Sequence, residues 1–334
     1  MANGRLLRQL VRAGVDGDQD AFRRASEAVI AEERDKQHHL LANDLEKLLY
    51  GRPTPVPSLS LLHLTKTVPS DKERGIDLVE VRQPSRQLDD LVVSRDVKTS
   101  IEQVLLEHNR QAALEGYGLE PARKLLFFGP PGCGKTLAAE VVAMELNLPL
   151  AIVRLDAVIS SYLGETAANL RKVFDFISSQ PLVALFDEFD ALAKERSGDG
   201  DHGELRRVVN AVLQMIDDYR GKSLIVAATN HENLLDSAIW RRFDETVKFS
   251  NPDAAQIAKL LQSKLSGVRR NFEASESAIV SKFKGMSHAD IERVLRRAIK
   301  EMILQGREFL ELAHLESALR RENRQSPTSK RCAK

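Results

Sequence analysis

The sequence predicts an α/β fold in which helices cover a largely parallel central sheet, with a helical bundle before it and a helical subdomain after it. Three patterns support this prediction. Apolar runs alternate with amphipathic stretches between about 86 and 250, residues 253 to about 320 show helical spacing only, and residues 5 to 50 repeat apolar side chains every three or four positions. Alternation of strand and helix is typical of a parallel sheet with helices on its faces.

Five apolar runs have the length and composition of buried strands. They are KLLFF at 124–128, LAIVRL at 150–155, LVALFD at 182–187, SLIVAAT at 223–229 and ETVKF at 245–249. Amphipathic stretches such as Thr136 to Leu146 and Leu205 to Tyr219 lie between them. These stretches are expected to cross over from one parallel strand to the next.

The same patterns divide the 334-residue chain into parts. The alternating prolines Pro53, Pro55 and Pro57 remove backbone donors and favour extended polyproline geometry, which predicts a spacer. The expected parts are a helical bundle at 1–50, a proline-containing linker at 51–85, an α/β nucleotide-binding subdomain at 86–250, a helical lid subdomain at 251–320 and a basic, disordered tail at 321–334.

The composition excludes several classes of protein. With Lys+Arg 49 against Asp+Glu 48, the net charge of +1 gives no overall basic field of the kind a dedicated duplex-DNA binder carries. Two cysteines are too few for a disulfide framework, so a reducing cytoplasm is the expected location. No apolar run approaches the roughly 20 residues that span a bilayer, and the N-terminus does not fit a signal peptide. A soluble, cytoplasmic protein without a membrane partner is expected.

The stretch GPPGCGKT at 129–136 matches the phosphate-loop pattern GxxxxGK[ST] between a predicted strand and a predicted helix. Glycines let the backbone N–H groups converge on phosphate oxygens, Lys135 is expected at the β- and γ-phosphates, and the Thr136 hydroxyl at Mg²⁺. A glycine-rich turn with a chance match is the alternative. The residues expected to bind the nucleotide here are Gly129, Pro130, Pro131, Gly132, Cys133, Gly134, Lys135, Thr136 and Leu137.

Cys133 lies within this loop and close to the start of the next predicted helix. A helix N-terminus can lower the pKa of a thiol and make it reactive. Ordinary packing is nevertheless the role expected for this side chain.

Two acids end the apolar run LVALFDEFD at 182–190. Asp187 stands at the carboxyl end of the strand, where ligands of open α/β sheets bind, and is the expected partner of Mg²⁺. Glu188 is placed to polarise the attacking water, because phosphoryl transfer depends mostly on positioning and charge stabilisation. The alternative is that both acids only cap the next helix.

Polar residues that follow the next strand complete the predicted catalytic set. Asn230 can hydrogen-bond the attacking water or the γ-phosphate, although an Asn after a strand is commonly a turn former. Arg241 and Arg242 each offer a permanent charge and a fork of donors that suits a phosphate. The alternative for this pair is stabilisation of a helix end.

These motifs, in this order, resemble those of the AAA ATPases over about residues 86–320, within the fold of the P-loop NTPases. GPPGCGKT resembles the Walker A motif, ALFDEFDAL the Walker B motif and ATNHENLLDSAIWRRFD the second region of homology. The resemblance implies ATP hydrolysis with Mg²⁺, an adenine contact at Val92, and a homo-hexamer in which Arg241 and Arg242 act as fingers in the neighbouring subunit. The adjacent arginines are similar to those of spastin, katanin and other single-module members that remodel proteins, a clade to which a bacterial chain could belong.

SSYLGET at 160–166 follows the LAIVRL strand and precedes a helical stretch. The resemblance implies that Tyr162 and Leu163 form a pore loop that grips an extended polypeptide, with 194–207 as a second pore loop. A flat aromatic ring gives contact area without reading sequence, which suits a motor that moves many sequences. The alternative is that Tyr162 packs under the following helix.

The resemblance therefore implies an ATP-driven machine that unfolds, threads or disassembles proteins, with residues 1–50 recruiting the substrate or an adaptor. One alternative is a nucleic-acid ATPase of clamp-loader or transposition-regulator type. The mixed charge of residues 194–207 argues against a nucleic-acid partner. Another alternative is an ATP-dependent scaffold or activator for a separate partner such as a protease, against which Glu188 and the two arginines argue.

Overall fold

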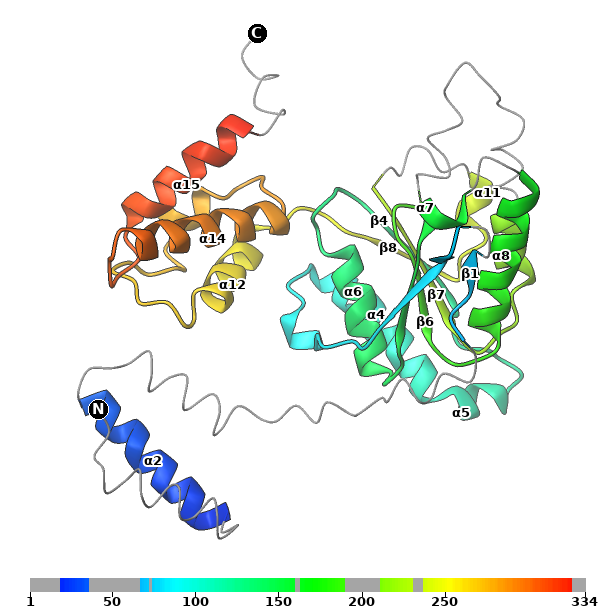
Figure 1. Cartoon of the computed structure of the whole chain (residues 1–334), viewed down its shortest axis with the longest axis horizontal. Helices are drawn as coiled ribbons and strands as arrows, with labels where there is room; N and C mark the ends of the chain where they lie inside the picture. The colour runs from blue at the N-terminus through cyan, green and yellow to red at the C-terminus, as the bar shows by residue number, and fades with distance from the viewer. Residues whose placement is uncertain are drawn as a thin grey trace. The chain divides into compact units, whose positions relative to one another are not determined.

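A computed structural model describes residues 19–35, 67–71, 74–159, 163–189, 211–230 and 237–325 of the chain. From the N-terminal part it describes one helix, α2 at Gln19–Asp35 (Figure 1). Ala25 and Val29, four residues apart, are buried, as is Ile30, so α2 has the apolar face that the sequence predicts. The rest of the predicted bundle at 1–50 lies outside the described residues and stays a prediction.

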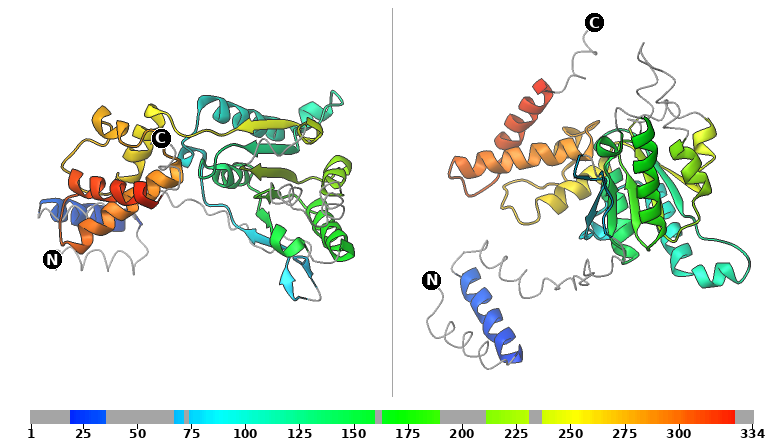
Figure 2. Two further views of the ribbon diagram at one scale, coloured as in Figure 1. Left: turned by 90° about the horizontal axis from the view of Figure 1, so that it is seen from above. Right: turned by 45° about the vertical axis from the view of Figure 1, so that its right-hand side comes forward.

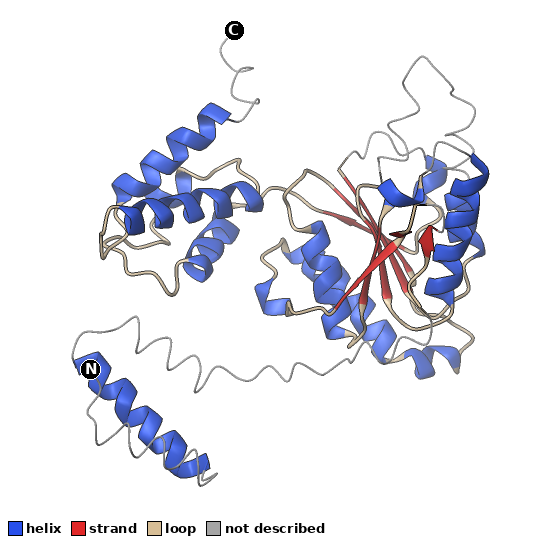
Figure 3. Ribbon diagram, in the orientation of Figure 1, coloured by secondary structure: helices blue, strands red, loops and turns tan. Residues whose placement is uncertain are grey.

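In the described part of the chain, a six-stranded sheet has the strand order β3-β5-β6-β7-β4-β8 (Figure 3). The strands are β3 (Val79–Arg82), β4 (Lys124–Phe128), β5 (Leu150–Val153), β6 (Val183–Phe186), β7 (Leu224–Thr229) and β8 (Glu245–Lys248). All neighbours pair in parallel except β3 and β5, which are antiparallel. The predicted α/β fold is confirmed, and its five predicted strands are β4 to β8.

The predicted linker at 51–85 is wrong at its C-terminal end. Strands β1 (Ser70–Asp71) and β2 (Ile76–Asp77) pair with each other, and β3 then joins the central sheet beside β5, with Val79 opposite Val153. The short sequence VEVR of β3 alternates apolar and charged side chains, and Val79 is buried in the core. One face of this strand is therefore apolar, as an antiparallel edge strand requires.

Helices cover both faces of the sheet (Figure 1 and Figure 2). Successive side chains of a strand point to opposite faces, so Leu126 of β4 packs in one core cluster and Leu125 and Phe127 pack in the other. The first cluster includes α8 (Leu163–Ser178) and helical residues 211–218, and the second includes α4 (Arg95–Asn109) and α6 (Lys135–Glu145). The shorter helices are η2 (Leu88–Asp90), α5 (Gln111–Glu115), α7 (Leu155–Val158) and α11 (Ser237–Trp240).

The predicted helical subdomain after the sheet is confirmed (Figure 1). Its helices are α12 (Ala254–Lys264), α13 (Ser277–Ser281), α14 (His288–Leu304) and α15 (Leu312–Gln325). Buried residues such as Leu261, Ile291 and Leu315 form its core. α15 runs five residues past the predicted boundary at 320, and the remainder of the predicted tail lies outside the described residues. Within the described ranges, no helix combines the length and the apolar character that a membrane crossing needs.

Candidate functional site

The predicted phosphate loop connects β4 to α6 at the carboxyl edge of the sheet. Gly129, Gly132 and Gly134 have φ values of +133°, +73° and +94°, in a region that side chains with a Cβ rarely adopt. A Cβ on Gly129 would also collide with the backbone oxygen of Phe249, so only glycine fits there. A backbone with this curl lets consecutive N–H groups converge on an anion.

Lys135, the first residue of α6, places a positive charge inside this loop. The residue is 6% exposed, and its Nζ donates hydrogen bonds of 2.8 Å to the carbonyl oxygens of both Gly129 and Pro130. These two carbonyls hold the ammonium group at the loop until phosphate oxygens compete for it. A lysine in this position supplies the charge that a bound triphosphate needs.

The next side chain along α6 meets the acidic end of β6. The Thr136 Oγ1 donates a 2.7 Å hydrogen bond to Asp187 Oδ2, so the hydroxyl and the carboxylate predicted to bind a metal ion lie together. The backbone N–H of Glu188 donates to Asp187 Oδ1 at 2.9 Å. Glu188 itself has a φ of +50°, an uncommon backbone conformation for a residue other than glycine.

The strand order explains why the predicted polar residues meet. β7 lies between β4, which leads to the phosphate loop, and β6, which ends in the acids. Asn230 directly follows β7 and therefore falls between the two. The Phe189 N–H donates to Ala228 O at 2.8 Å and ties the acidic turn to the end of β7. Ligands of open α/β sheets bind at this edge.

A cleft of about 700 Å³ opens at this edge, between the sheet and the helical subdomain. Of the residues predicted for nucleotide, metal and catalysis, those that line it are Val92, Pro131, Gly132, Cys133, Gly134, Lys135, Thr136, Leu137, Asp187, Glu188 and Asn230. Gly129 and Pro130 do not line it, and they shape the loop through their carbonyl bonds to Lys135.

The start of α14 closes one side of the cleft against the phosphate loop. The Ala289 N–H donates to Gly132 O at 3.0 Å, and a Cβ on Gly132 would come within 2.8 Å of the Ser287 hydroxyl. Ser287 caps α14, because its Oγ accepts from the backbone N–H of Asp290 and donates to the Asp290 carboxylate at 2.8 Å. The cap fixes the turn that touches the loop.

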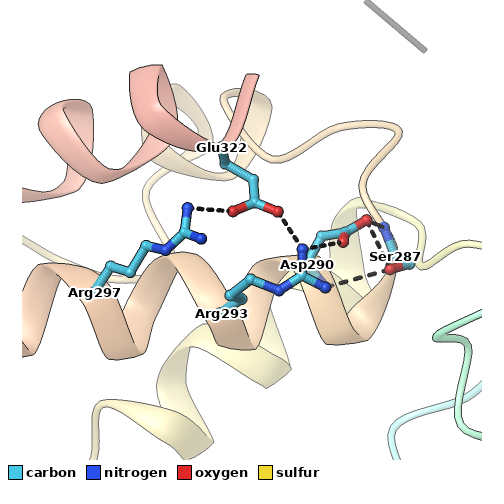
Figure 4. Close-up of polar contacts among 5 residues, drawn as sticks. All are labelled: Ser287, Asp290, Arg293, Arg297 and Glu322. Atoms are coloured by element: carbon cyan, nitrogen blue, oxygen red, sulfur yellow. Dashed lines mark hydrogen bonds and ion pairs between the residues drawn. The ribbon is translucent and has the colours of Figure 1, made fainter. Parts of the chain in front are cut away.

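A buried carboxylate joins α14 to α15 (Figure 4). The side chain of Glu322 on α15 is 3% exposed and pairs with Arg293 and, at 2.6 Å, with Arg297. Arg293 also pairs with Asp290 at 3.2 Å, next to the cap. These ion pairs therefore connect α15 to the turn at the start of α14 that touches the phosphate loop.

The helical subdomain supplies one wall of the cleft, and the charged pairs in that wall were not predicted from the sequence. Lys264 of α12 and Arg296 of α14 both pair with Glu292, at 3.4 Å and 2.8 Å. Burial raises the pKa of Glu292, but Lys264 and Arg296 together lower it below its usual value. The other lining residues, which were not named as site residues from the sequence, are Arg86, Asp90, Leu91, Leu260, Ser263, His288 and Ala289.

Cys133 packs rather than reacts. Its thiol is buried and donates to Asn251 Oδ1 at 3.3 Å. Burial raises the pKa of Cys133, and the opposing effect of Lys135 is smaller. The packing role expected from the sequence agrees with this, and the helix N-terminus does not lower the pKa of Cys133 because desolvation of the thiolate outweighs the nearby positive charge.

The two predicted finger arginines do not line this cleft. Both follow α11 directly. Arg242 pairs with Asp217 at 2.6 Å, whereas Arg241 is exposed. The structure thus separates two residues that the sequence left equivalent.

The predicted pore residues are described only in part. Tyr162 and the second predicted pore loop at 194–207 lie outside the described residues. Leu163 is the first residue of α8, and later residues of this helix pack on the face of the sheet opposite α4 and α6. The pore assignment therefore stays a prediction.

The residues of the cleft fit a nucleoside triphosphate. The curled glycine loop and Lys135 suit phosphate oxygens, and the apolar side chains of Leu91, Val92 and Leu260 suit a base. No cluster of three or more His, Cys, Asp or Glu side chains suited to a metal ion occurs among the described residues. Thr136 and Asp187 would supply the one or two protein oxygens that Mg²⁺ commonly uses when phosphate and water complete its ligands.

Comparisons with known proteins show the family of the chain. Residues 125–251 match the family described as "ATPase family associated with various cellular activities (AAA)". The chain is 42% identical over 333 residues to an uncharacterized AAA family ATPase of Sinorhizobium fredii, y4kL, covering 100% of this chain and 99% of the relative. It is 32% identical over 209 residues to a putative 26S proteasome regulatory subunit homolog of Methanocaldococcus jannaschii, covering 61% of this chain and 56% of the relative. The predicted spastin- and katanin-like clade stays a prediction. The chain itself binds and hydrolyses ATP as a member of the AAA family of ATPases.

Proposed function

We propose that this ATPase assembles into a ring, expected to be a homo-hexamer, which uses ATP to unfold, thread or disassemble proteins. Three parts of the proposal have separate support: the roles of the residues in the cleft, the sharing of a site between subunits, and the nature of the substrate.

In the cleft, Thr136 and Asp187 hold Mg²⁺, and Glu188 polarises the attacking water. The 2.7 Å contact between Thr136 and Asp187 supports the first role. Support for the second comes from the left-handed backbone of Glu188, a conformation that costs roughly 1–3 kcal/mol and persists mostly at functional sites. Asn230, between the loop and the acids, orients the water or the γ-phosphate.

The observation that carries the ring is that neither Arg241 nor Arg242 lines the cleft of its own chain. Phosphoryl transfer gains orders of magnitude in rate from an arginine that neutralises the developing charge. A neighbouring subunit can supply it. Arg241 is exposed, whereas Arg242 is held by Asp217, so we assign the larger role to Arg241.

A protein substrate is supported by the relative named as a proteasome regulatory subunit homolog and by the sequence of the predicted pore loop around Tyr162. Residues 1–50 recruit the substrate or an adaptor. Residues 194–207 carry both signs of charge, which does not favour a nucleic-acid strand in the pore.

The test uses casein, an unfolded polypeptide, as the probe. Wild type and Tyr162→Phe are expected to hydrolyse ATP faster when casein is added, because both keep the aromatic ring. Tyr162→Ala should bind ATP normally and lose this stimulation. Loss of ATP binding in Tyr162→Ala would place the side chain in the core and refute its pore role. Stimulation by single-stranded DNA but not by casein would favour the nucleic-acid class instead.

A further inference from the structure

His288 is the first residue of α14 and lines the cleft. Both of its ring nitrogens are buried, and neither makes a hydrogen bond to any residue that the structure describes. Burial of an unpaired polar nitrogen is unfavourable, so such groups are rare in native proteins. An unpaired group at the wall of a ligand site points to the ligand as its partner.

The other histidines in the described ranges, His108 and His314, can be compared with His288 by the hydrogen bonds that their rings make. His108 contacts the Ala122 carbonyl oxygen through Nε2 at 2.7 Å. His314 accepts from the Glu311 N–H at Nδ1, at 3.0 Å, and lies 3.1 Å from Gln305 Oε1 at Nε2. Both have their partners within the protein. His288 differs from them in lining the cleft and in lacking such a bond.

The surroundings of His288 keep its ring neutral. Burial lowers the pKa of His288 and outweighs the opposing effect of the Val92 backbone, a contact that lacks hydrogen-bond geometry. A neutral imidazole has one N–H donor and one nitrogen acceptor. Which of these two nitrogens faces a base decides which base edge the imidazole can pair with.

The shape of the cleft brings a nucleotide base to this histidine. The triphosphate is held at the loop around Lys135 and at the Thr136 and Asp187 pair. A base that extends away from the phosphate loop would reach apolar side chains of the cleft such as Val92, and Val92 lies beside His288. A rotation of the ring about its side-chain bonds would bring one of the buried nitrogens to that space.

We propose that the His288 imidazole hydrogen-bonds the edge of the adenine base and favours ATP over nucleotides with other bases. Adenine presents an amino donor beside ring-nitrogen acceptors, whereas guanine presents a carbonyl oxygen and a ring N–H. A fixed imidazole distinguishes these edges. This inference rests on nucleotide binding by the family and not on the proposed protein substrate.

The test is equilibrium binding of ATP, GTP and inorganic tripolyphosphate to the full chain. His288→Ala should bind ATP roughly tenfold more weakly, the effect of one lost hydrogen bond, with a smaller change for GTP. Tripolyphosphate has no base, so its affinity should not change. His288→Asn keeps a donor and an acceptor and should retain part of the preference for ATP. His108→Ala removes a half-buried histidine outside the cleft and should leave the ATP to GTP ratio unchanged.

Thermal unfolding without nucleotide gives a second, independent readout. His288→Ala removes two unpaired buried nitrogens, so its melting temperature should equal or exceed that of the wild type while its ATP affinity falls. An unchanged ATP to GTP ratio in His288→Ala would overturn the proposal. An equal loss of ATP and tripolyphosphate affinity would also overturn it, because His288 would then act by positioning the phosphate loop.

Discussion

The carboxylate of Glu322 should be a main support of the helical subdomain, and Glu322→Gln is the change that tests this. The side chain joins Arg293 and Arg297 of α14 to α15, and it is 3% exposed (Figure 4). Glutamine keeps the size and one acceptor oxygen. It removes the negative charge and turns an NH₂ group toward one of the arginines.

The magnitude follows from the two contacts and their exposure. A hydrogen bond to a charged group contributes roughly 1.5–3 kcal/mol, but part of that is lost to water where a partner is exposed. Arg293 and Arg297 are 50% and 31% exposed in their side chains, so we expect a loss of unfolding free energy near the lower end. A loss of about 2 kcal/mol lowers the melting temperature by roughly 4–8 °C when the unit that unfolds has about 150–250 residues.

The assay is thermal unfolding of the full chain, with Glu316→Gln as the matched control. Glu316 lies on the same helix, α15, and pairs with Lys282 at 2.6 Å, but both of these side chains are well exposed, at 43% and 39%. The control should therefore unfold like the wild type. An equal melting temperature for Glu322→Gln and Glu316→Gln would refute the reasoning. It would mean that the cost of burying the Glu322 charge cancels its attraction to the arginines.

Three further predictions concern the loop, the acid and the histidines. Gly129→Ala should unfold at a lower temperature than Gly118→Ala, because both have positive φ but a Cβ meets backbone only at Gly129, whereas equal melting would contradict the clash. Glu188→Gln should bind ATP normally in a filter assay and hydrolyse it roughly 10²–10⁴ times more slowly, and near-normal turnover would exclude its role. Burial lowers the pKa of His108 and His288, so the unfolded chain binds more protons below the ordinary histidine value of about 6.5. The free energy of unfolding should therefore be largest above that pH and decrease as the pH falls below it. Calorimetry should show a smaller decrease for the His108→Gln, His288→Gln double variant. An equal decrease would argue against both shifts.

The catalytic edge of the cleft could be predicted from sequence because local patterns determine it. A buried strand, a glycine loop and a helix placed Lys135 and Thr136, and the acid at the end of another buried strand placed Asp187. The rule that ligands bind at the carboxyl ends of parallel strands then brought these residues together. The structure places the Thr136 hydroxyl 2.7 Å from the Asp187 carboxylate, so these two side chains do lie together.

Other features depended on tertiary structure and could not be read in this way. The four residues of β3 become a strand only because β5 offers an open edge. The wall formed by Lys264, His288 and Glu292 comes from helices far along the chain, where polar side chains look like an ordinary solvated face. The one local signal for it was the capping sequence at Ser287, which marks the start of α14 and so the position of His288.

The same limit applies to Arg241 and Arg242. Adjacent arginines look equivalent in the sequence, and only the ion pair with Asp217 separates them. Tyr162 lies outside the described residues, so its predicted role in a pore loop still depends on its place in the sequence alone.

The central claim is that one ATP site uses residues from two subunits, and mixing two inactive variants tests it most directly. Glu188→Gln lacks the activating acid, and the Arg241→Ala, Arg242→Ala variant lacks the fingers. In mixed assemblies, an intact cleft of the arginine variant can receive arginines from a Glu188→Gln neighbour, so ATPase activity should rise well above the sum of the separate variants. Activity no greater than that sum, or full ATPase activity of the double-arginine variant alone, would contradict the shared site.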